Sequence, residues 1–391
     1  NYTALLMYIP RKIEKEAIIS IKNNPVTAVI GPRQCGKSTL VKQLLLNFKN
    51  PVYLDLERPS DLQKLEDAEW FFSSQKGKLI CIDEIQRKPD LFPVIRSLVD
   101  DWGGNGRFLV LGSSSRDLLK QSSESLAGRI SYKHLTPFLF EEIKSDFAIE
   151  KYITAGGFPR SILAKSNAIS FAWRTDFIST FLERDLRQWA GFAPVTMRRL
   201  WQMLAHLNGQ TVNYSSVGNS LGMSNVTIRN YIDLLEGTFM VEVLPPYVSN
   251  FGKRLIKAPK IYVADSGLTM ALIGLTNFEQ LSGHPVVGSV WEQIVLSNLK
   301  GHFPKAEFSY YRTTSGAEID IVLKINNSVF AVECKASLSP VITKGTYFAI
   351  EDIQPLHTFI VAPVQKSWSL KQGIDVVSIT DIVKRINKQI K

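Results

Sequence analysis

One stretch near the N-terminus, residues 26–39, constrains the fold of this chain more than any other. It reads VTAVIGPRQCGKST and contains the G-x-x-x-x-G-K-S pattern of a phosphate-binding loop. The β-branched run before the loop predicts a strand, and the apolar positions after it predict a helix. The glycines allow successive backbone N–H groups to face one point, where Lys37 and the helix N-terminus add positive charge. The stretch therefore predicts a site for the phosphates of ATP or GTP.

The expected roles within this loop follow from the strand–loop–helix order. The backbone and Lys37 would bind the β- and γ-phosphates, and the Ser38 hydroxyl would hold Mg²⁺. A glycine turn with a chance lysine is the alternative, and the flanking strand and helix argue against it. The expected nucleotide-binding residues are Gly31, Pro32, Arg33, Gln34, Cys35, Gly36, Lys37, Ser38 and Thr39.

A second nucleotide signal is LICIDE at residues 79–84. Four apolar residues predict a buried parallel strand that ends in two carboxylates, at the edge where ligands of such sheets bind. Asp83 would hold Mg²⁺ through water, and Glu84 would orient or deprotonate the attacking water. A third strand, residues 107–112, ends in Ser113, whose hydroxyl would contact the γ-phosphate or that water. The alternative for the two carboxylates is a solvated acidic turn after a buried strand.

Length and composition limit what the rest of the chain can be. The 391 residues are 45% hydrophobic and 21% charged, as in an ordinary globular protein of several domains. The apolar runs are too short for a membrane span and no signal peptide is visible, so the cytoplasm is the expected location. The three cysteines suit neither a disulfide framework nor a zinc site. The net charge of +10 favours a polyanionic partner, although many basic proteins bind no nucleic acid.

Several motifs follow one another in the order of a known family. GPRQCGKST, YLDLE, ICIDEIQ, LGSSS and SLAGR precede a TPFLFEE stretch. Together they resemble prokaryotic AAA-type ATPases that carry a C-terminal domain of unknown function with a nuclease-like end. The resemblance implies catalytic roles for Lys37, Glu84 and Ser113. It adds Arg129 as a charge sensor or arginine finger, and a structural salt bridge is an equal alternative for this residue.

Residues 138–199 are predicted to be mainly helical. Within them, FLERDL at residues 181–186 resembles a family motif. Its charged residues Glu183, Arg184 and Asp185 would either reach a neighbouring subunit's nucleotide or form ion pairs on the helix surface. The ion pairs are favoured because exposed helical charges are usually solvated.

Residues 212–243 predict a winged helix-turn-helix. A short helix from Tyr214 would end at Gly222, and Ser224 would cap a second helix that ends at Gly237. Packing or protein contact is the alternative use of this element, and Asp233 on the outward face weakens the case for DNA. The outward face of the second helix and the loop between two wing strands supply the expected DNA contacts, which are Asn225, Thr227, Arg229, Asn230, Lys253, Arg254 and Lys257.

The C-terminal part contains a second candidate for chemistry. Two strands, AEIDIVLK and SVFAVECK, would form a hairpin with its two-residue turn at Asn326 and Asn327. A period of two then places Asp320 opposite Glu333 and Glu318 opposite Lys335 on one face, with core residues on the other. Directly opposed carboxylates repel each other unless a cation lies between them, and a second Mg²⁺ or a Mn²⁺ would supply it.

An upstream carboxylate, Glu292, lies on an apolar helix face and needs a partner. Glu292, Asp320, Glu333 and Lys335 together resemble the PD-(D/E)xK nuclease constellation, in which the lysine would orient a metal-activated water. That fold is often kept in copies without activity. The alternative is a cross-strand ion pair between Glu318 and Lys335, with solvated acids elsewhere.

The sequence thus predicts an α/β multidomain protein that binds ATP and Mg²⁺. Its favoured function is ATP hydrolysis coupled to a DNA-binding, nuclease-like C-terminal half. The alternatives are a nucleotide-dependent regulatory switch that binds a protein partner without cutting DNA, and an ATP-gated metal-dependent DNA nuclease. Nucleic acid is the expected partner, further copies of the chain or a protein are alternatives, and a membrane is not expected. The predicted domains are an AAA-type P-loop parallel-sheet core (1–136), a helical lid (137–194), a winged helix-turn-helix (195–264) and a PD-(D/E)xK-like α/β domain (265–391).

Overall fold

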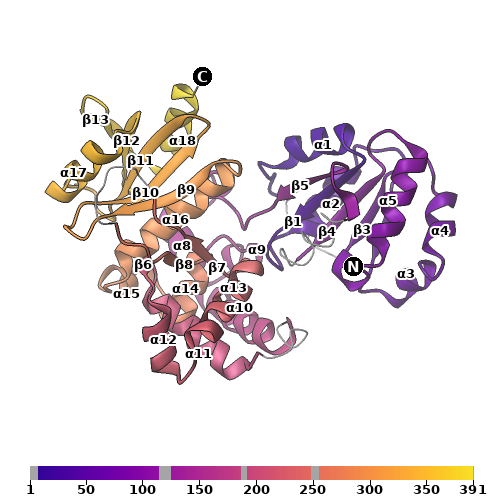
Figure 1. Cartoon of the computed structure of the whole chain (residues 1–391), viewed down its shortest axis with the longest axis horizontal. Helices are drawn as coiled ribbons and strands as arrows, with labels where there is room; N and C mark the ends of the chain where they lie inside the picture. Colours follow the sequence, from indigo (N-terminus) through magenta and orange to yellow (C-terminus); the bar gives the residue numbers. More distant parts are fainter. Residues whose placement is uncertain (1–7, 114–124, 186–191, 248–254, 391) are drawn as a thin grey trace. The chain divides into compact units, whose positions relative to one another are not determined.

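The structure is a computed structural model that describes residues 8–113, 125–185, 192–247 and 255–390. The chain divides into two compact units (Figure 1). One comprises residues 1–138 with 237–239, and the other comprises residues 139–236 with 240–391. Within the described ranges, no helix is both long enough and apolar enough to cross a membrane.

The N-terminal unit is built on a five-stranded parallel sheet with the strand order β2-β3-β4-β1-β5. The strand that leads into the phosphate-binding loop, β1, therefore lies inside the sheet. This arrangement confirms the predicted parallel α/β core. Its elements are α1 (Glu14–Asn23), β1 (Val26–Ile30), α2 (Lys37–Leu45), β2 (Val52–Asp55), α3 (Pro59–Lys64), α4 (Ala68–Ser74), β3 (Ile80–Asp83), a 3₁₀ turn (Ile85–Arg87), α5 (Leu91–Trp102), β4 (Phe108–Gly112) and β5 (Ile130–His134).

Both faces of this sheet are buried, which explains why its strands are almost uniformly apolar. Ala28 and Ile30 of β1 pack on the face covered by α4 and α5. Val29 points to the other face and packs with Leu40 and Leu44 of α2 and with α1. The carboxyl ends of β1, β3 and β4 meet at one edge, where the predicted nucleotide residues follow each strand.

The C-terminal unit begins with a helical region and a small three-stranded antiparallel sheet of order β6-β8-β7. A π-helical turn (Phe181–Asp185) continues α10 within it. The elements are α7 (Phe140–Ile143), α8 (Ile149–Ala155), α9 (Pro159–Ile162), α10 (Asn167–Thr180), α11 (Pro194–His206), β6 (Gln210–Thr211), α12 (Tyr214–Leu221), α13 (Asn225–Gly237), β7 (Val241–Leu244), β8 (Lys260–Val263), α14 (Ser266–Leu272), α15 (Phe278–Ser282) and α16 (Val287–His302).

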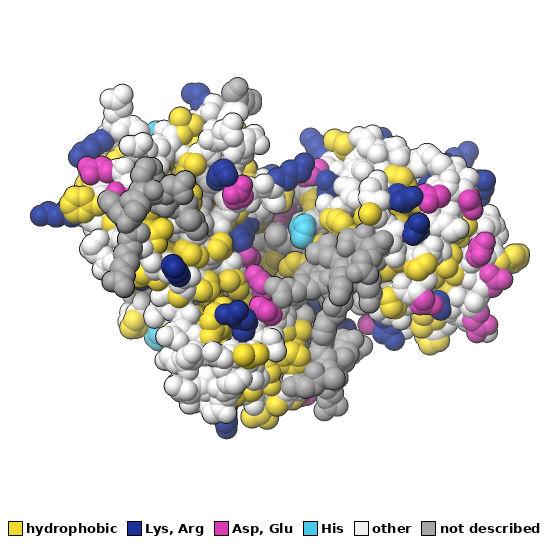
Figure 2. All heavy atoms as spheres, in the orientation of Figure 1, with side chains coloured by type: hydrophobic (Ala, Val, Ile, Leu, Met, Phe, Trp, Pro, Cys, Tyr) yellow, Lys and Arg dark blue, Asp and Glu magenta, His cyan; other side chains and the backbone are white. Residues whose placement is uncertain are grey.

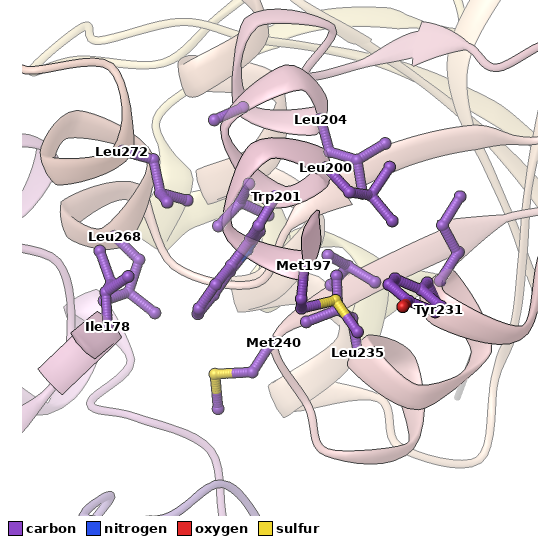
Figure 3. Packing of buried hydrophobic residues seen from close by; sticks show 14 of the residues in the cluster. Ile178, Met197, Leu200, Trp201, Leu204, Tyr231, Leu235, Met240, Leu268 and Leu272 are labelled. Atoms are coloured by element: carbon purple, nitrogen blue, oxygen red, sulfur yellow. The ribbon is translucent and has the colours of Figure 1, made fainter. Parts of the chain in front are cut away.

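One hydrophobic core joins these helices to the small sheet (Figure 3). Trp201 of α11 lies at its centre, with Leu268 of α14 and Leu235 of α13 in the same cluster. The predicted inward residues of α13, among them Ile228 and Ile232, are buried as expected. The packing of α11, α12 and α13 thus depends on residues that are far apart in the chain.

The turn between α12 and α13 has the predicted caps. Gly222 adopts a left-handed conformation with φ of 67°, and the Ser224 hydroxyl accepts a hydrogen bond of 3.1 Å from the Thr227 N–H. Gly218 of α12 approaches this turn so closely that a Cβ atom would lie 2.5 Å from the Met223 carbonyl oxygen. Glycine at position 218 is therefore part of the turn's geometry.

The rest of the unit is a six-stranded mixed sheet with the order β13-β14-β12-β11-β10-β9. The β10–β11 hairpin has the predicted register from Ile321 opposite Val332 to Ile325 opposite Ser328, around a two-residue turn at Asn326–Asn327. The pairing of β10 with β9 shifts between Ile319 and Val322, so the predicted period of two does not continue unbroken to Asp320 and Glu318. Ile319 and Val322 accordingly pack in the same core cluster. Helix α17 packs on one face, and α16 contacts β11 on the sheet together with α18. The elements are β9 (Glu307–Arg312), β10 (Glu318–Ile325), β11 (Ser328–Cys334), α17 (Lys344–Ile353), β12 (His357–Val361), β13 (Trp368–Lys371), β14 (Ile374–Val377) and α18 (Ile379–Gln389).

Charge on the drawn face of the molecule is mixed. Figure 2 shows lysine and arginine side chains interspersed with aspartate and glutamate side chains over each unit. On this face the net charge of +10 is therefore not gathered into one basic patch.

Candidate nucleotide-binding site and carboxylate cluster

The phosphate-binding loop connects β1 to α2 and depends on two glycines for different reasons. Gly36 has φ of 101°, in the left-handed region that favours glycine, and ends the loop at the start of α2. Gly31 is extended, but a Cβ atom there would lie 2.0 Å from the Leu135 carbonyl oxygen. The loop therefore packs directly against the chain that follows β5. A side chain at position 31 would push the two apart.

Lys37 is the first residue of α2 and is buried. Its ammonium donates hydrogen bonds to the carbonyl oxygens of Gly31 (3.0 Å) and Pro32 (2.9 Å). These contacts hold the positive charge against the first residues of the loop, beside the backbone N–H groups at the start of α2. Ser38 follows directly, at the position from which a hydroxyl would reach a metal ion bound to the phosphates.

Arg11 links the phosphate-binding loop to the chain that follows β5, and no motif in the sequence indicated this role. Its guanidinium is buried and donates to the carbonyl oxygens of Cys35 (3.2 Å) and Thr136 (2.7 Å). It also stacks over the ring of Phe138, with 4.5 Å between its Cζ atom and the ring centroid. Thr136 is 125 positions away in the sequence, so this contact depends on the folded sheet.

The two carboxylates at the end of β3 have separate environments. Asp83 is buried and accepts hydrogen bonds from the Tyr53 phenol (2.5 Å) and from the backbone N–H of Glu84 (3.0 Å). Glu84 itself has φ of 57°, a left-handed conformation that is uncommon outside glycine and turns its side chain away from the strand. The change of backbone conformation at Glu84 thus gives Asp83, the candidate metal ligand, and Glu84, the candidate base, different positions.

Glu84 belongs to a polar network across two neighbouring strands. The Gln86 amide donates to the Glu84 carboxylate and to the Ser113 hydroxyl, the latter at 3.0 Å. The Ser113 hydroxyl lies 3.5 Å from the same Glu84 oxygen. Burial raises the pKa of Glu84, and the charge of Lys37 opposes this shift. Gln86 is a second residue that the sequence did not single out, since it follows the carboxylates in a turn without a pattern.

Three arginines of the N-terminal unit are paired with carboxylates. Arg33 lies 3.6 Å from a Glu57 carboxylate oxygen, and Arg87 lies 3.7 Å from the same atom. Arg129 makes a two-point contact with Asp100 of α5, with N–O distances of 2.5 and 2.9 Å. The hydrogen bond from Arg129 keeps the pKa of Asp100 below its ordinary value. In this structure Arg129 therefore has the salt bridge that was the alternative to a sensor role. It lies beside Val26 at the start of β1, whereas the phosphate-binding loop follows Ile30 at the other end of that strand.

The predicted DNA-contact residues lie in three kinds of position. Asn225, Arg229 and Asn230 are exposed on α13, Thr227 is half-buried there, and Lys257 is exposed before β8. Lys253 and Arg254 lie outside the described residues, as do the side chains of Arg184 and Asp185, while Glu183 is exposed on the π-helical turn. The Arg229 guanidinium stacks over the ring of Tyr214, 5.2 Å from its centroid.

The predicted nuclease-like residues do come together, around a lysine that the sequence analysis missed. Lys260 is the first residue of β8, and its side chain is 2% exposed. Its ammonium nitrogen lies 2.9 Å from Glu292, 3.1 Å from Glu318 and 3.5 Å from Asp320, measured to the nearest carboxylate oxygens. We call the acidic residues here the carboxylate cluster, and its members are Glu292, Glu318, Asp320 and Glu333.

Each carboxylate of this cluster has identifiable partners. Glu292, buried on α16, also accepts a hydrogen bond from the Tyr262 phenol, so β8 supplies the partner that its apolar helix face required. Burial and then Asp320 raise the pKa of Glu292 to about 7, against the charge of Lys260. Burial alone would lower the pKa of Lys260, but the three neighbouring carboxylates outweigh it and raise that pKa. The lysine is therefore a buried cation.

The end of the hairpin completes the cluster. Asp320 accepts a hydrogen bond of 2.8 Å from the Cys334 N–H, and Lys335 pairs with Glu333 at 2.7 Å. The alternative pair of Lys335 with Glu318 is wrong, because Glu318 contacts Lys260 and Arg312 instead. Glu333 is 5% exposed, and burial together with Asp320 raises its pKa.

A divalent metal does not fit this arrangement. The position between the carboxylates, where the hairpin register called for a cation, holds the Lys260 ammonium. Within the described ranges, no three His, Cys, Asp or Glu side chains are grouped so that they could hold a metal ion. The expected second Mg²⁺ or Mn²⁺ is therefore not supported. By contrast, Ser38 and Asp83 supply hydroxyl and carboxylate oxygens, the ligand types that suit Mg²⁺ beside a nucleotide.

Comparisons with known families divide the chain into three matched regions. The AAA domain family matches residues 23–144. Two domains of unknown function follow, DUF8612 over residues 146–279 and DUF4143 over residues 287–382. The first match covers the phosphate-binding loop and both carboxylates at the end of β3. It supports ATP binding by the N-terminal unit.

Several relatives match most of the chain. The Uncharacterized protein Rv2008c of Mycobacterium tuberculosis is 38% identical over 360 residues, which is 92% of this chain and 81% of that protein. An Uncharacterized protein of Haemophilus influenzae is 27% identical over 68% of this chain and 74% of its own length. Among solved structures, the Walker-type ATPase PABY2304 of Pyrococcus abyssi is similar at 14% identity and a TM-score of 0.46, over 68% of this chain and 96% of that chain. The identity and coverage of the mycobacterial relative show that this chain belongs to the same protein family as Rv2008c, with an AAA-type P-loop ATPase domain in its N-terminal unit.

Proposed function

We propose that the N-terminal unit hydrolyses ATP in the presence of Mg²⁺ and that its nucleotide state is coupled to the C-terminal unit. The observation that carries this proposal is the contact of Glu84 with Ser113 and Gln86 at the edge of the sheet. A buried carboxylate beside a hydroxyl from the next strand is a suitable device for holding a water molecule in line with a γ-phosphate.

Different residues of the N-terminal unit would have different roles in phosphoryl transfer. The loop N–H groups and Lys37 would bind the phosphates, for which Lys37 would have to give up its contacts with the Gly31 and Pro32 carbonyl oxygens. Ser38 and Asp83 would hold Mg²⁺, which would neutralise charge on the phosphates when bound. Glu84 accepts a proton from the attacking water, and its raised pKa brings it closer to that task.

ATP turnover by the full chain, with and without duplex DNA, tests this proposal. We expect Glu84→Gln to lower kcat by about a hundredfold or more while ATP binding persists. Lys37→Ala should abolish ATP binding. Glu66→Gln, an exposed carboxylate elsewhere in the same unit, is the matched control and should retain full turnover. A wild-type protein without turnover, or full turnover in Glu84→Gln, would contradict the proposal.

A second candidate function, DNA binding, rests on the outward face of α13. Asn225, Arg229 and Asn230 are exposed in one helix that follows a tight turn after α12, and the chain carries a net charge of +10. Asparagine and arginine are the side chains that pair with adenine and guanine edges in a major groove. The three-stranded sheet β6-β8-β7 beside these helices supports the winged-helix interpretation.

Binding of a fluorescent duplex to the full chain tests this second candidate. Arg229→Ala should weaken binding by about tenfold and reduce its salt dependence. Arg160→Ala, which removes the same charge from an exposed site on α9, is the control. Equal binding by both variants would argue against α13. If DNA also leaves ATP turnover unchanged, a nucleotide-dependent switch that binds a protein becomes the better interpretation.

A further inference from the structure

The carboxylate cluster already contains its cation. The Lys260 ammonium contacts oxygens from α16 and β10 within 3.5 Å, and its side chain is 2% exposed. Its ammonium nitrogen also lies over the ring of Tyr310, 5.5 Å from the ring centroid. A buried ammonium with three carboxylate neighbours is fixed by contacts from several directions and is not a mobile surface side chain.

The charges in and around the cluster nearly balance. If all groups are ionised, four carboxylates face three cations, because Lys335 pairs with Glu333 and Arg312 with Glu318. A divalent ion placed among the same oxygens would lie close to the ammonium, and like charges at such distances repel strongly in a buried site. It would also need metal–oxygen distances of about 2.0–2.6 Å, shorter than the contacts that accommodate Lys260.

One carboxylate oxygen of the cluster is left without a hydrogen-bond partner by Lys260 and its neighbours. Oε2 of Glu333 is buried and makes no hydrogen bond within the described residues. Lys335 and the Thr346 hydroxyl both contact the other oxygen, Oε1. The cluster therefore retains an unpaired acceptor beside Asp320, which would favour an added cation once the ammonium is removed.

We propose that Lys260 takes the place of the divalent metal in the carboxylate cluster. The cluster is then a metal-independent ionic link between β8 of the three-stranded sheet and the six-stranded sheet. Glu292 of α16 and Asp320 of β10 share one cation from β8, so the link ties three elements together. This inference concerns the C-terminal unit and is independent of ATP hydrolysis.

Mn²⁺ binding to the nucleotide-free full chain, followed by the loss of the free-ion EPR signal, tests the proposal. Wild type and Asp320→Asn should bind the same amount of Mn²⁺, since no site depends on the cluster. Lys260→Met should gain one Mn²⁺ site at least about tenfold tighter than any in wild type, because it removes the repelling charge. The double variant Lys260→Met/Asp320→Asn should lose that gain.

The matched control is Lys324→Met. Lys324 is on the same strand as Asp320 and pairs with Glu307 at 3.2 Å, but both side chains are exposed. It should gain no Mn²⁺ site. Mn²⁺ binding by wild type that disappears in Asp320→Asn would overturn the proposal, even if Lys260→Met does not fold. A folded Lys260→Met protein without an added Mn²⁺ site would overturn it as well.

Discussion

The phenol of Tyr53 donates a hydrogen bond of 2.5 Å to Oδ2 of Asp83. It comes from β2, the strand next to β3, and connects the candidate metal ligand to the edge of the sheet. Burial and this bond to the Asp83 carboxylate raise the pKa of Tyr53, so the phenol stays protonated as a donor. Tyr53 is therefore a positioning residue for Asp83.

Replacing this phenol should affect turnover more than nucleotide binding. In Tyr53→Phe, Asp83 loses one of its two donors among the described residues, and its carboxylate is then held only by the Glu84 N–H. We expect kcat to fall by about tenfold and the Mg²⁺ concentration for half-maximal rate to change, with ATP affinity within about twofold of wild type. Steady-state kinetics over a range of Mg²⁺ concentrations measure this. An unchanged Mg²⁺ dependence would contradict a role through Asp83.

Gln86 is expected to position the candidate base. Its amide bridges Glu84 and Ser113, so Gln86→Ala frees the carboxylate from the adjacent strand. Because small displacements of a catalytic group are costly, kcat should fall by about ten- to a hundredfold without a matching loss of ATP binding. Gln63→Ala, at an exposed position of α3, is the control and should match wild type. Full turnover in Gln86→Ala would show that Glu84 is held by other contacts.

The stability of the C-terminal unit should depend on pH through Asp265. This buried carboxylate accepts hydrogen bonds from the N–H groups of Gly157 (2.7 Å) and Leu268 (3.1 Å). Burial, the largest effect, raises its pKa from 3.8 to about 6. Between these values the folded chain retains a proton that the unfolded chain has released, so stability falls as pH rises and the loss is complete above about pH 6.

The variant Asp265→Asn removes this titration. This variant should be less stable than wild type at low pH, because it replaces one acceptor with a donor. Its stability should not fall further between pH 3.8 and about pH 6. The difference in the free energy of unfolding between the two proteins should change by on the order of 3 kcal/mol from well below pH 3.8 to well above about pH 6. Denaturant unfolding at several pH values measures it. Parallel pH profiles of the two proteins would be the contrary result.

Two helical glycines should respond in opposite ways to alanine. A Cβ atom on Gly267 of α14 would lie 2.2 Å from the Ala155 carbonyl oxygen, which is backbone and cannot easily yield. Gly288 of α16 has no atom within 4 Å of such a Cβ. Gly267→Ala should therefore lower the free energy of unfolding by about 1–3 kcal/mol or more, whereas Gly288→Ala should raise it by about 0.5–1 kcal/mol. Thermal melts of the two variants distinguish these outcomes, and equal shifts would contradict the close approach of α14 to α8.

The sequence by itself determined the features that one continuous segment can encode. The phosphate-binding loop requires neighbouring N–H groups, two glycines and a following helix, all within residues 26–45. The β10–β11 register follows from a two-residue turn and a period of two, and the α12–α13 turn follows from its caps. In each case the interacting groups are close in the chain, so local geometry and spacing are sufficient.

Only the tertiary structure decided which charges share a site. Lys260 is 32 positions from Glu292 and 60 from Asp320, and its surroundings in the sequence read as an ordinary strand. Arg11 likewise contacts Cys35 of the loop, 24 positions away, and Thr136, 125 positions away. A hairpin register can show that two carboxylates need a cation, but it cannot show whether a metal ion or a distant lysine supplies it. The answer depends on how β8 packs against the larger sheet. This packing buries the Lys260 charge beside distant carboxylates, and the spacing of residues near Lys260 in the sequence does not indicate it.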